Sequence, residues 1–133
     1  MSGMPIFNQT FGLLKKVLDL RQQNQQLITT NIANAETPGY VPARLDFEKG
    51  LQQALAAQAP VPAARDASVN QALDRVEGTV VRLPGNGAIG DNNRVEVDQE
   101  MVSLAENEIM YEAAVSMMTK KLAMLKYVAS DGR

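Results

Sequence analysis

Carboxylates are the side chains of this sequence whose spacing could support chemistry. They crowd one stretch near the C-terminal end, as Glu96, Asp98, Glu100, Glu106 and Glu108. Grouped carboxylates can bind a divalent metal ion or act as a general acid and base pair. The same grouping is typical of a solvated helix face and of a helix start, where negative charge suits the helix dipole. We favour the second interpretation and expect no metal site and no cofactor.

Composition excludes most other chemistry. The 133 residues contain no Cys and no His, which removes thiolate and imidazole catalysis and the commonest zinc and haem ligands. The formal net charge of -2 offers no basic face for nucleic-acid phosphates. No stretch suits a membrane span, and the first residues lack the basic and apolar regions of a cleaved signal peptide. We expect a protein that is not an enzyme and binds no nucleic acid.

The apolar residues gather at the two ends of the chain. From Phe7 to Ala35 a helical stripe recurs at alternating spacings of four and three, and comprises Phe7, Phe11, Leu14, Leu18, Ile28, Ile32 and Ala35. Arg21 and Gln25 fall on the same stripe, so its middle is polar and could set the register of a neighbour. A second apolar side, formed by Leu13, Val17, Leu20 and Leu27, predicts packing against two or more neighbours.

A second helix is predicted from Asp98 to about Val128. Its stripe has the same spacing, is interrupted at Glu108, and comprises Val97, Met101, Leu104, Tyr111, Val115, Met118, Leu122, Leu125 and Ala129. Asp98 can cap the first turn. The two helices would be about 43 and 46 Å long at 1.5 Å per residue. Their matched lengths predict a coiled-coil-like pair.

Between the two helices the composition changes, because most prolines and glycines lie between residues 38 and 90. We predict a short helix over 51–58, a mobile linker over 59–67, a short strand over 79–83 and turns over 84–93. The middle holds too few large apolar residues for an independent core. The expected fold is all-α, with an N-terminal helix and turn (1–40), a small irregular and partly mobile middle with a strand or hairpin as an option (41–93), and a C-terminal helix (94–133).

The most specific local sequence follows the first helix, from Asn31 to Tyr40. Pro38 disfavours helical geometry at Thr37, and Pro38-Gly39 is a preferred centre of a type II turn with positive φ at the glycine. A plain helix stop followed by a loop explains these residues. Two Asn residues near a helix end are poor helix formers, so we also consider that Asn31 and Asn34 face a neighbouring backbone.

This stretch resembles the Asn-rich, Thr-Pro-Gly-Tyr motif near the amino terminus of flagellar rod and hook axial proteins. The matching residues are Asn31, Asn34, Thr37, Pro38, Gly39 and Tyr40. Residues 43–47, 101–111 and 121–127 are similar to the proximal rod members of this family. The middle of the chain is not covered by the resemblance, and a sister proximal rod protein is the nearest competing assignment.

The resemblance implies a structural subunit that is exported by the flagellar type III apparatus and stacked helically into the periplasmic rod of the basal body, where it transmits torque. The implied partners are copies of itself, other rod proteins, basal-body components at the rod base, and the export gate. Phe7 and Phe11 resemble the export-gate recognition motif of early flagellar subunits, although two Phe at this spacing more often form part of a packed helix face. A soluble helical adaptor or export chaperone is the alternative from another class.

Overall fold

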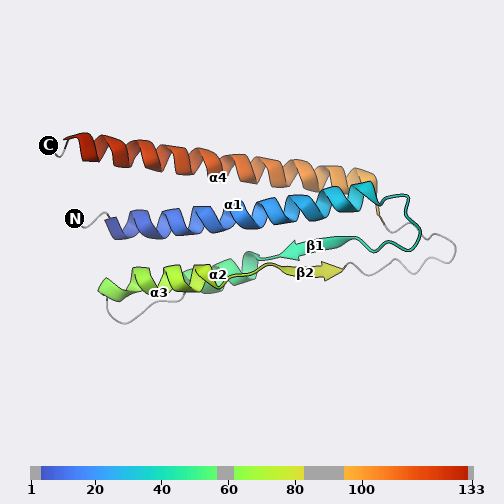
Figure 1. The fold of residues 1–133 in the computed structure, drawn as a ribbon, viewed down its shortest axis with the longest axis horizontal. Helices are drawn as coiled ribbons and strands as arrows, with labels where there is room; N and C mark the ends of the chain where they lie inside the picture. The colour runs from blue at the N-terminus through green and yellow to red at the C-terminus, as the bar shows by residue number, and fades with distance from the viewer. Residues whose placement is uncertain (1–3, 57–61, 83–94, 132–133) are drawn as a thin grey trace.

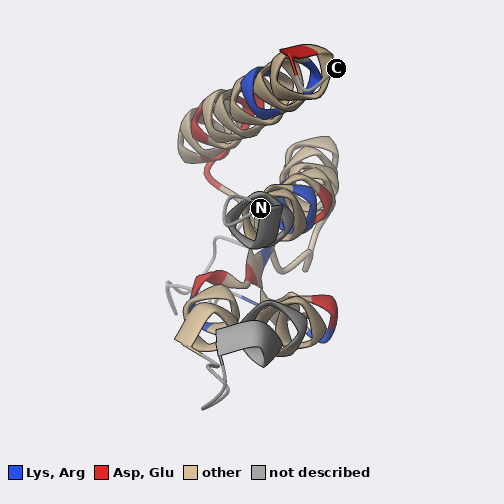
Figure 2. Ribbon diagram, turned by 90° about the vertical axis from the view of Figure 1, so that its left-hand side faces the viewer, with Lys and Arg blue, Asp and Glu red and all other residues tan. Residues whose placement is uncertain are grey.

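The computed structural model of the chain describes residues 4–56, 62–82 and 95–131 (Figure 1). In chain order its elements are α1 (Met4–Ala33), β1 (Ala43–Asp46), α2 (Glu48–Ala56), α3 (Pro62–Asp74), β2 (Thr79–Arg82) and α4 (Val97–Asp131). They form three layers, with α4 on one side, α1 in the middle, and α2, α3 and the two strands on the other side (Figures 1 and 2). The prediction of an all-α fold with two long terminal helices side by side is confirmed.

The turn after α1 is the one predicted from Pro38 and Gly39. The amide of Tyr40 donates a hydrogen bond to the carbonyl oxygen of Thr37 at 3.2 Å. Gly39 has a φ of 75°, which a type II turn requires at its third position. The turn reverses the chain, so that β1 runs back along α1 (Figure 1).

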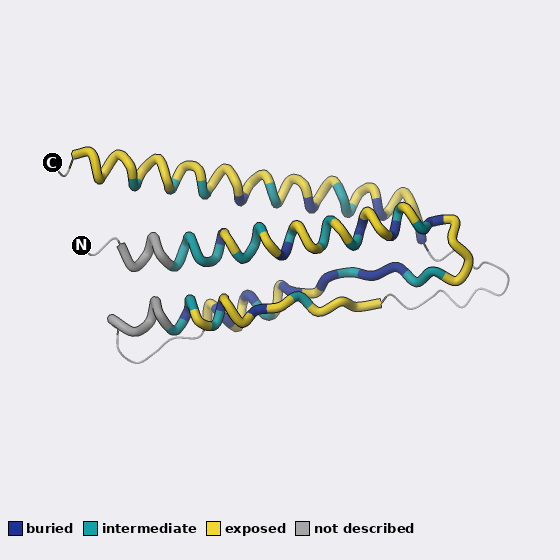
Figure 3. The backbone as a smooth tube through the Cα atoms, in the orientation of Figure 1, coloured by how far each residue is buried: buried dark blue, intermediate teal, exposed yellow. Residues whose placement is uncertain are grey.

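Helix α4 runs antiparallel to α1 and, within the described part of the chain, packs mainly against this helix (Figure 1). It begins at Val97, one residue before the predicted start, with Asp98 and Glu100 in its first turn. Carboxylates there suit the positive end of the helix dipole. Its side away from α1 is exposed along the whole length of the helix (Figure 3).

The middle of the chain is more ordered than the sequence predicted. Residues 62–67 begin α3, so the mobile linker predicted over 59–67 is wrong from Pro62 onward, and 59–61 lie outside the described residues. The predicted short helix is α2, which starts earlier, at Glu48. The predicted strand is β2, which pairs antiparallel with β1 from Thr79 opposite Asp46 to Arg82 opposite Ala43. The predicted turns over 84–93 lie outside the described residues.

The core lies between α1 and the layer formed by α2, α3 and the two strands. Its buried members are Leu20, Leu45, Phe47, Leu51, Ala54, Val69, Leu73 and Val76. Leu13, Val17 and Leu27 of α1 pack against it, which confirms that α1 uses a second apolar side. The guanidinium of Arg21 lies 4.9 Å from the centre of the Phe47 ring and covers one edge of the core. The layer of α2, α3 and the two strands therefore needs α1 to complete its core.

Gly39→Val tests the turn. Because a β-branched residue is strained at positive φ, we expect a loss of about 1 kcal/mol or more in the free energy of unfolding. Gly39→Asn is the matched control, since Asn tolerates this region and should lose less. Urea unfolding measures both changes. A Val variant as stable as the original chain would contradict the constraint.

Candidate assembly surface

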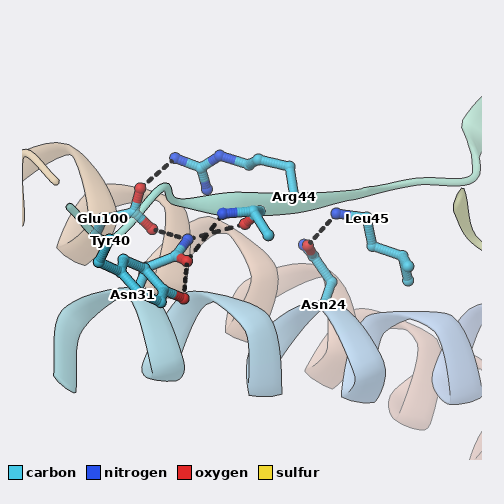
Figure 4. A network of polar contacts seen from close by, with 7 residues as sticks. Asn24, Asn31, Tyr40, Arg44, Leu45 and Glu100 are labelled. Carbon is cyan, nitrogen blue, oxygen red and sulfur yellow. Dashed lines mark hydrogen bonds and ion pairs between the residues drawn. The ribbon is translucent and has the colours of Figure 1, made fainter. Parts of the chain in front are cut away.

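Asn31, which comes from the family-like motif, is buried where three segments meet (Figure 4). Its side-chain amide donates to the carbonyl oxygen of Ala43 at 2.8 Å and to Oε2 of Glu100 at 3.1 Å. Its Oδ1 accepts from the backbone amide of Ala43 at 3.0 Å and from the hydroxyl of Tyr40 at 3.0 Å. All donor and acceptor positions of the amide are thus used. The hypothesis that Asn31 and Asn34 face a neighbouring backbone therefore holds for Asn31, whereas Asn34 bonds to the end of its own helix.

Glu100 is the carboxylate that completes this junction. It is 3% exposed, and its Oε1 pairs with Nη2 of Arg44 on β1 at 2.9 Å. The other candidates of the acidic stretch, Glu96, Asp98, Glu106 and Glu108, are exposed. Within the described ranges, no group of three or more metal-binding side chains is assembled. The one buried carboxylate of this stretch therefore ties α4 to α1 and β1.

The rest of the motif serves the turn. Asn34 does not reach another segment, because its side-chain amide donates to the carbonyl oxygen of Thr30 in the same helix at 2.9 Å. The hydroxyl of Thr37 donates to Oδ1 of Asn34 at 3.1 Å. Pro38 and Gly39 are exposed at the turn. The two Asn residues of the motif thus differ in role, since Asn31 joins layers and Asn34 closes the end of α1.

A second polar junction, which the sequence analysis missed, lies midway along α1 and α4. Asn107 is 2% exposed and donates to the carbonyl oxygen of Arg21 at 2.8 Å and to Oε1 of Gln25 at 3.4 Å. Its Oδ1 accepts from Asn24 at 3.1 Å and from Arg21 at 3.4 Å. Asn24 in turn accepts from the amide of Leu45 at 3.3 Å. The polar interruption predicted on α1 therefore meets a polar residue of α4.

The stripe predicted on α4 coincides only in part with the surface that faces α1. Its half-buried members are Leu104, Tyr111, Met118 and Leu125. Its exposed members are Val97, Met101, Val115, Leu122 and Ala129. The positions between the half-buried residues are taken instead by Glu100, Asn107 and Ala114, which are buried, and by half-buried Lys121. Four members of the predicted stripe therefore face α1, whereas the other five are exposed in the single chain, and their role in packing stays a prediction.

The stripe predicted on α1 is better matched by burial. Leu14, Ile28 and Ala35 are buried, and Phe11, Leu18 and Ile32 are half-buried. The side chain of Phe7 lies outside the described residues.

Large apolar side chains are exposed on several sides of α4 away from its contact with α1, and we call this exposed surface the outer face. Its residues are Val97, Met101, Val102, Ile109, Met110, Val115, Met117, Leu122, Met124, Tyr127 and Val128. Isolated exposed apolar residues are normal, but many of them along a single helix are typical of an interaction site. Its four methionines can adapt to neighbours of different shape.

No helix in the described part of the chain is long and apolar enough to cross a membrane. The hollow beside α1, of about 500 Å³, is open and lined mainly by amide and charged side chains such as Gln22, Gln26 and Glu77. The outer face of α4 is therefore the stronger candidate for function.

Comparison with known proteins decides the family. No family model matches the chain. The chain is 31% identical over 131 residues to the flagellar basal body rod protein FlgB of Bacillus subtilis. The matched region covers 98% of this chain and 100% of that protein. It is 30% identical to FlgB of Aeromonas hydrophila over 90% of this chain and 91% of that protein. For FlgB of Escherichia coli the identity is 29%, over 89% of this chain and 91% of that protein.

The chain belongs to the FlgB family of flagellar basal body rod proteins. The family resemblance found from the Asn31–Tyr40 motif is thereby confirmed. FlgB membership places the protein in the flagellar basal body, among other flagellar components. The alternative of a soluble adaptor or export chaperone finds no support among these relatives.

Asn31→Ala tests the junction of the three segments. The change removes every hydrogen bond of the buried amide and leaves the backbone of Ala43 and one oxygen of Glu100 unpaired, so we expect a loss of about 2–3 kcal/mol in the free energy of unfolding. Asn34→Ala is the matched control and should lose less than about 1 kcal/mol, because its bonds stay within one helix end. Urea unfolding of both variants gives the comparison. Equal losses would show that Asn31 has no special role.

Proposed function

We propose that this FlgB-family chain is a non-enzymatic structural subunit of the proximal rod, which assembles helically in the periplasm and transmits torque. It would reach that site through the flagellar type III export apparatus. The observation that carries the assembly part of this proposal is the outer face of α4. Family membership supports the place of assembly, and the packing of the two long helices supports the mechanism.

The apolar residues of α4 flank its seam with α1 on both sides. Residues seven apart lie on nearly the same side of a helix. Met110, Met117 and Met124 follow this spacing along one flank. Val115 and Leu122 follow it along the other flank, where Met101 also lies. A helix with apolar flanks on both sides of its own intramolecular seam requires further neighbours on both sides to bury them.

Side-by-side packing of α1–α4 pairs satisfies this requirement. In each α1–α4 pair, one flank of α4 would face the subunit on one side and the other flank would face the subunit on the other side. Repetition of such a head-to-tail contact produces a ring or a helical array. The partners we propose are copies of this chain, other rod proteins, basal-body components at the rod base and, during secretion, the export gate. Torque would pass between subunits through these helix contacts, while the Asn31–Glu100 and Asn24–Asn107 contacts keep each pair from sliding.

Met117→Lys with Met124→Lys tests the flank in assembly. Both side chains are more than half exposed, at 56% and 54%, so the free energy of unfolding should change by no more than about 0.5 kcal/mol. Rod completion and swimming should be lost, because two charges would be buried between subunits.

The matched control for this double variant is Ser116→Lys with Ala123→Lys. It adds the same charge at the same spacing in the same part of α4, but at exposed positions that lack a large apolar side chain. Swimming and the yield of basal bodies with rods measure both variants. Normal rods with both methionines replaced would contradict the proposed contact.

Phe7→Ala with Phe11→Ala tests the export motif. We expect less of this variant in the periplasm of cells that cannot complete the rod, because recognition precedes assembly. Leu14→Ala with Leu18→Ala is the matched control, since it removes apolar side chains at the same spacing on the same stripe of α1. Equal export of the two variants would leave Phe7 and Phe11 as packing residues only.

A further inference from the structure

We infer that Glu100 and Asn107 fix the rotation of α4 about its own axis, against an alternative rotation that would pack a more apolar stripe onto α1. This inference concerns the fold of the isolated chain. It therefore does not depend on the proposed function, although it bears on which face of α4 is free for assembly.

Two seams compete on α4 because the helix is apolar on several sides. Both contain Leu104, Tyr111, Met118 and Leu125, which are half-buried against α1. The observed seam fills the alternate positions with Glu100, Asn107, Ala114 and Lys121. The alternative seam, which is the stripe predicted from the sequence, fills them with Met101, Glu108, Val115 and Leu122. Adjacent heptad positions are separated by about 50° around a helix, so a small turn of α4 exchanges one seam for the other.

Apolar burial by itself favours the alternative seam. The turn would cover Met101, Val115 and Leu122, which are now 52%, 40% and 53% exposed. It would uncover only one buried apolar residue of the alternate positions, Ala114. Since burial of apolar surface is favourable in proportion to its area, another interaction must hold α4 in the observed rotation.

Paired polar side chains provide that interaction at two levels of the seam. Asn31 of α1 bonds to Glu100 at 3.1 Å, and Asn24 of α1 bonds to Asn107 at 3.1 Å. The two α1 residues are seven apart, and so are the two α4 residues, so both contacts occupy the same place in consecutive heptads. A buried polar residue at a heptad core position is a known means of selecting one helix arrangement.

The alternative rotation would break both contacts. Glu100 would move away from Asn31 and Arg44, which now pair with its two oxygens, so the buried amide of Asn31 and the half-buried guanidinium of Arg44 would lose their acceptor. Asn107 would move away from Asn24 and from the carbonyl oxygen of Arg21. A buried polar group without a partner is strongly unfavourable, so these losses offset the gain in apolar burial. The consequence is that Met101, Val115 and Leu122 stay on the outer face.

Engineered disulfides can report the rotation, because the chain has no Cys of its own. Because α1 and α4 are antiparallel, residues at the same level have numbers with a constant sum, which is 131 in both polar contacts. Ala114 is therefore level with residue 17, next to Leu18 on the α1 stripe. Leu18→Cys with Ala114→Cys reports the observed seam. Leu18→Cys with Val115→Cys reports the alternative seam. The ratio of the two oxidation rates under mild oxidant measures the preference.

Each reporter pair is then combined with Glu100→Met and Asn107→Leu, which remove both polar contacts from α4. We expect the rate ratio to move toward the Val115 reporter by about tenfold, which corresponds to about 1.4 kcal/mol. The matched control is Gln99→Leu with Glu106→Met, which removes an amide and a carboxylate at the same spacing from exposed positions of the other flank. This control should leave the ratio unchanged.

Two results would overturn the inference. One is an unchanged ratio in the Glu100→Met, Asn107→Leu chain when circular dichroism shows full helicity. The other is loss of helicity in that chain, because the alternative apolar seam should hold α4 on α1 without the polar contacts. The single variant Asn107→Leu gives an independent reading, since it should shift the ratio in the same direction by a smaller factor.

Discussion

Helix α1 lies between two layers that contact one another directly through the Arg44–Glu100 ion pair, and the rest of the structure depends on how α1 joins them. One side of α1 packs against α4. Another side, through Leu20 and its neighbours, completes the core with α2, α3 and the two strands. Between these two sides lie Asn24 and Asn31, seven residues apart. Each bonds to the backbone of β1 and to a polar side chain of α4. The two amides thus set the position of both outer layers relative to α1.

Helix α4 leaves many large apolar side chains exposed because of the way it packs on α1. Helix α4 packs on one face only, and part of that face is polar, so the α1–α4 pair gains less from apolar burial than its composition would allow. Polar contacts depend on position, whereas apolar contacts tolerate rotation and sliding. A subunit with a defined outer face is what side-by-side assembly requires, because each copy must present the same surface to its neighbours.

The motif from Asn31 to Tyr40 forms its contacts within the chain. Gly39 allows the turn that returns the chain along α1. The side-chain oxygen of Asn31 accepts hydrogen bonds from the hydroxyl of Tyr40 and from the backbone amide of Ala43 at the start of β1. The same amide then reaches Glu100 in the first turn of α4. A motif near the N-terminus therefore helps to define where the C-terminal helix begins to pack. Its value to a rod protein would come through the geometry of the helix pair.

Local features were readable from the sequence because their causes lie within a few residues. The periodicity of apolar residues predicted α1 and α4, Pro38-Gly39 predicted the turn, and the motif with its flanking residues indicated the family. Strand β1 was missed because Ala43–Asp46 is a strand only through its pairing with β2. The run before Val69 looked like a linker because its helix gains stability only when Val69 and Leu73 enter the core with α1. The rotation of α4 was decided by tertiary structure alone. A helix that is apolar on several sides offers more than one stripe for packing, and the partners of Glu100 and Asn107 on another part of the chain select between them.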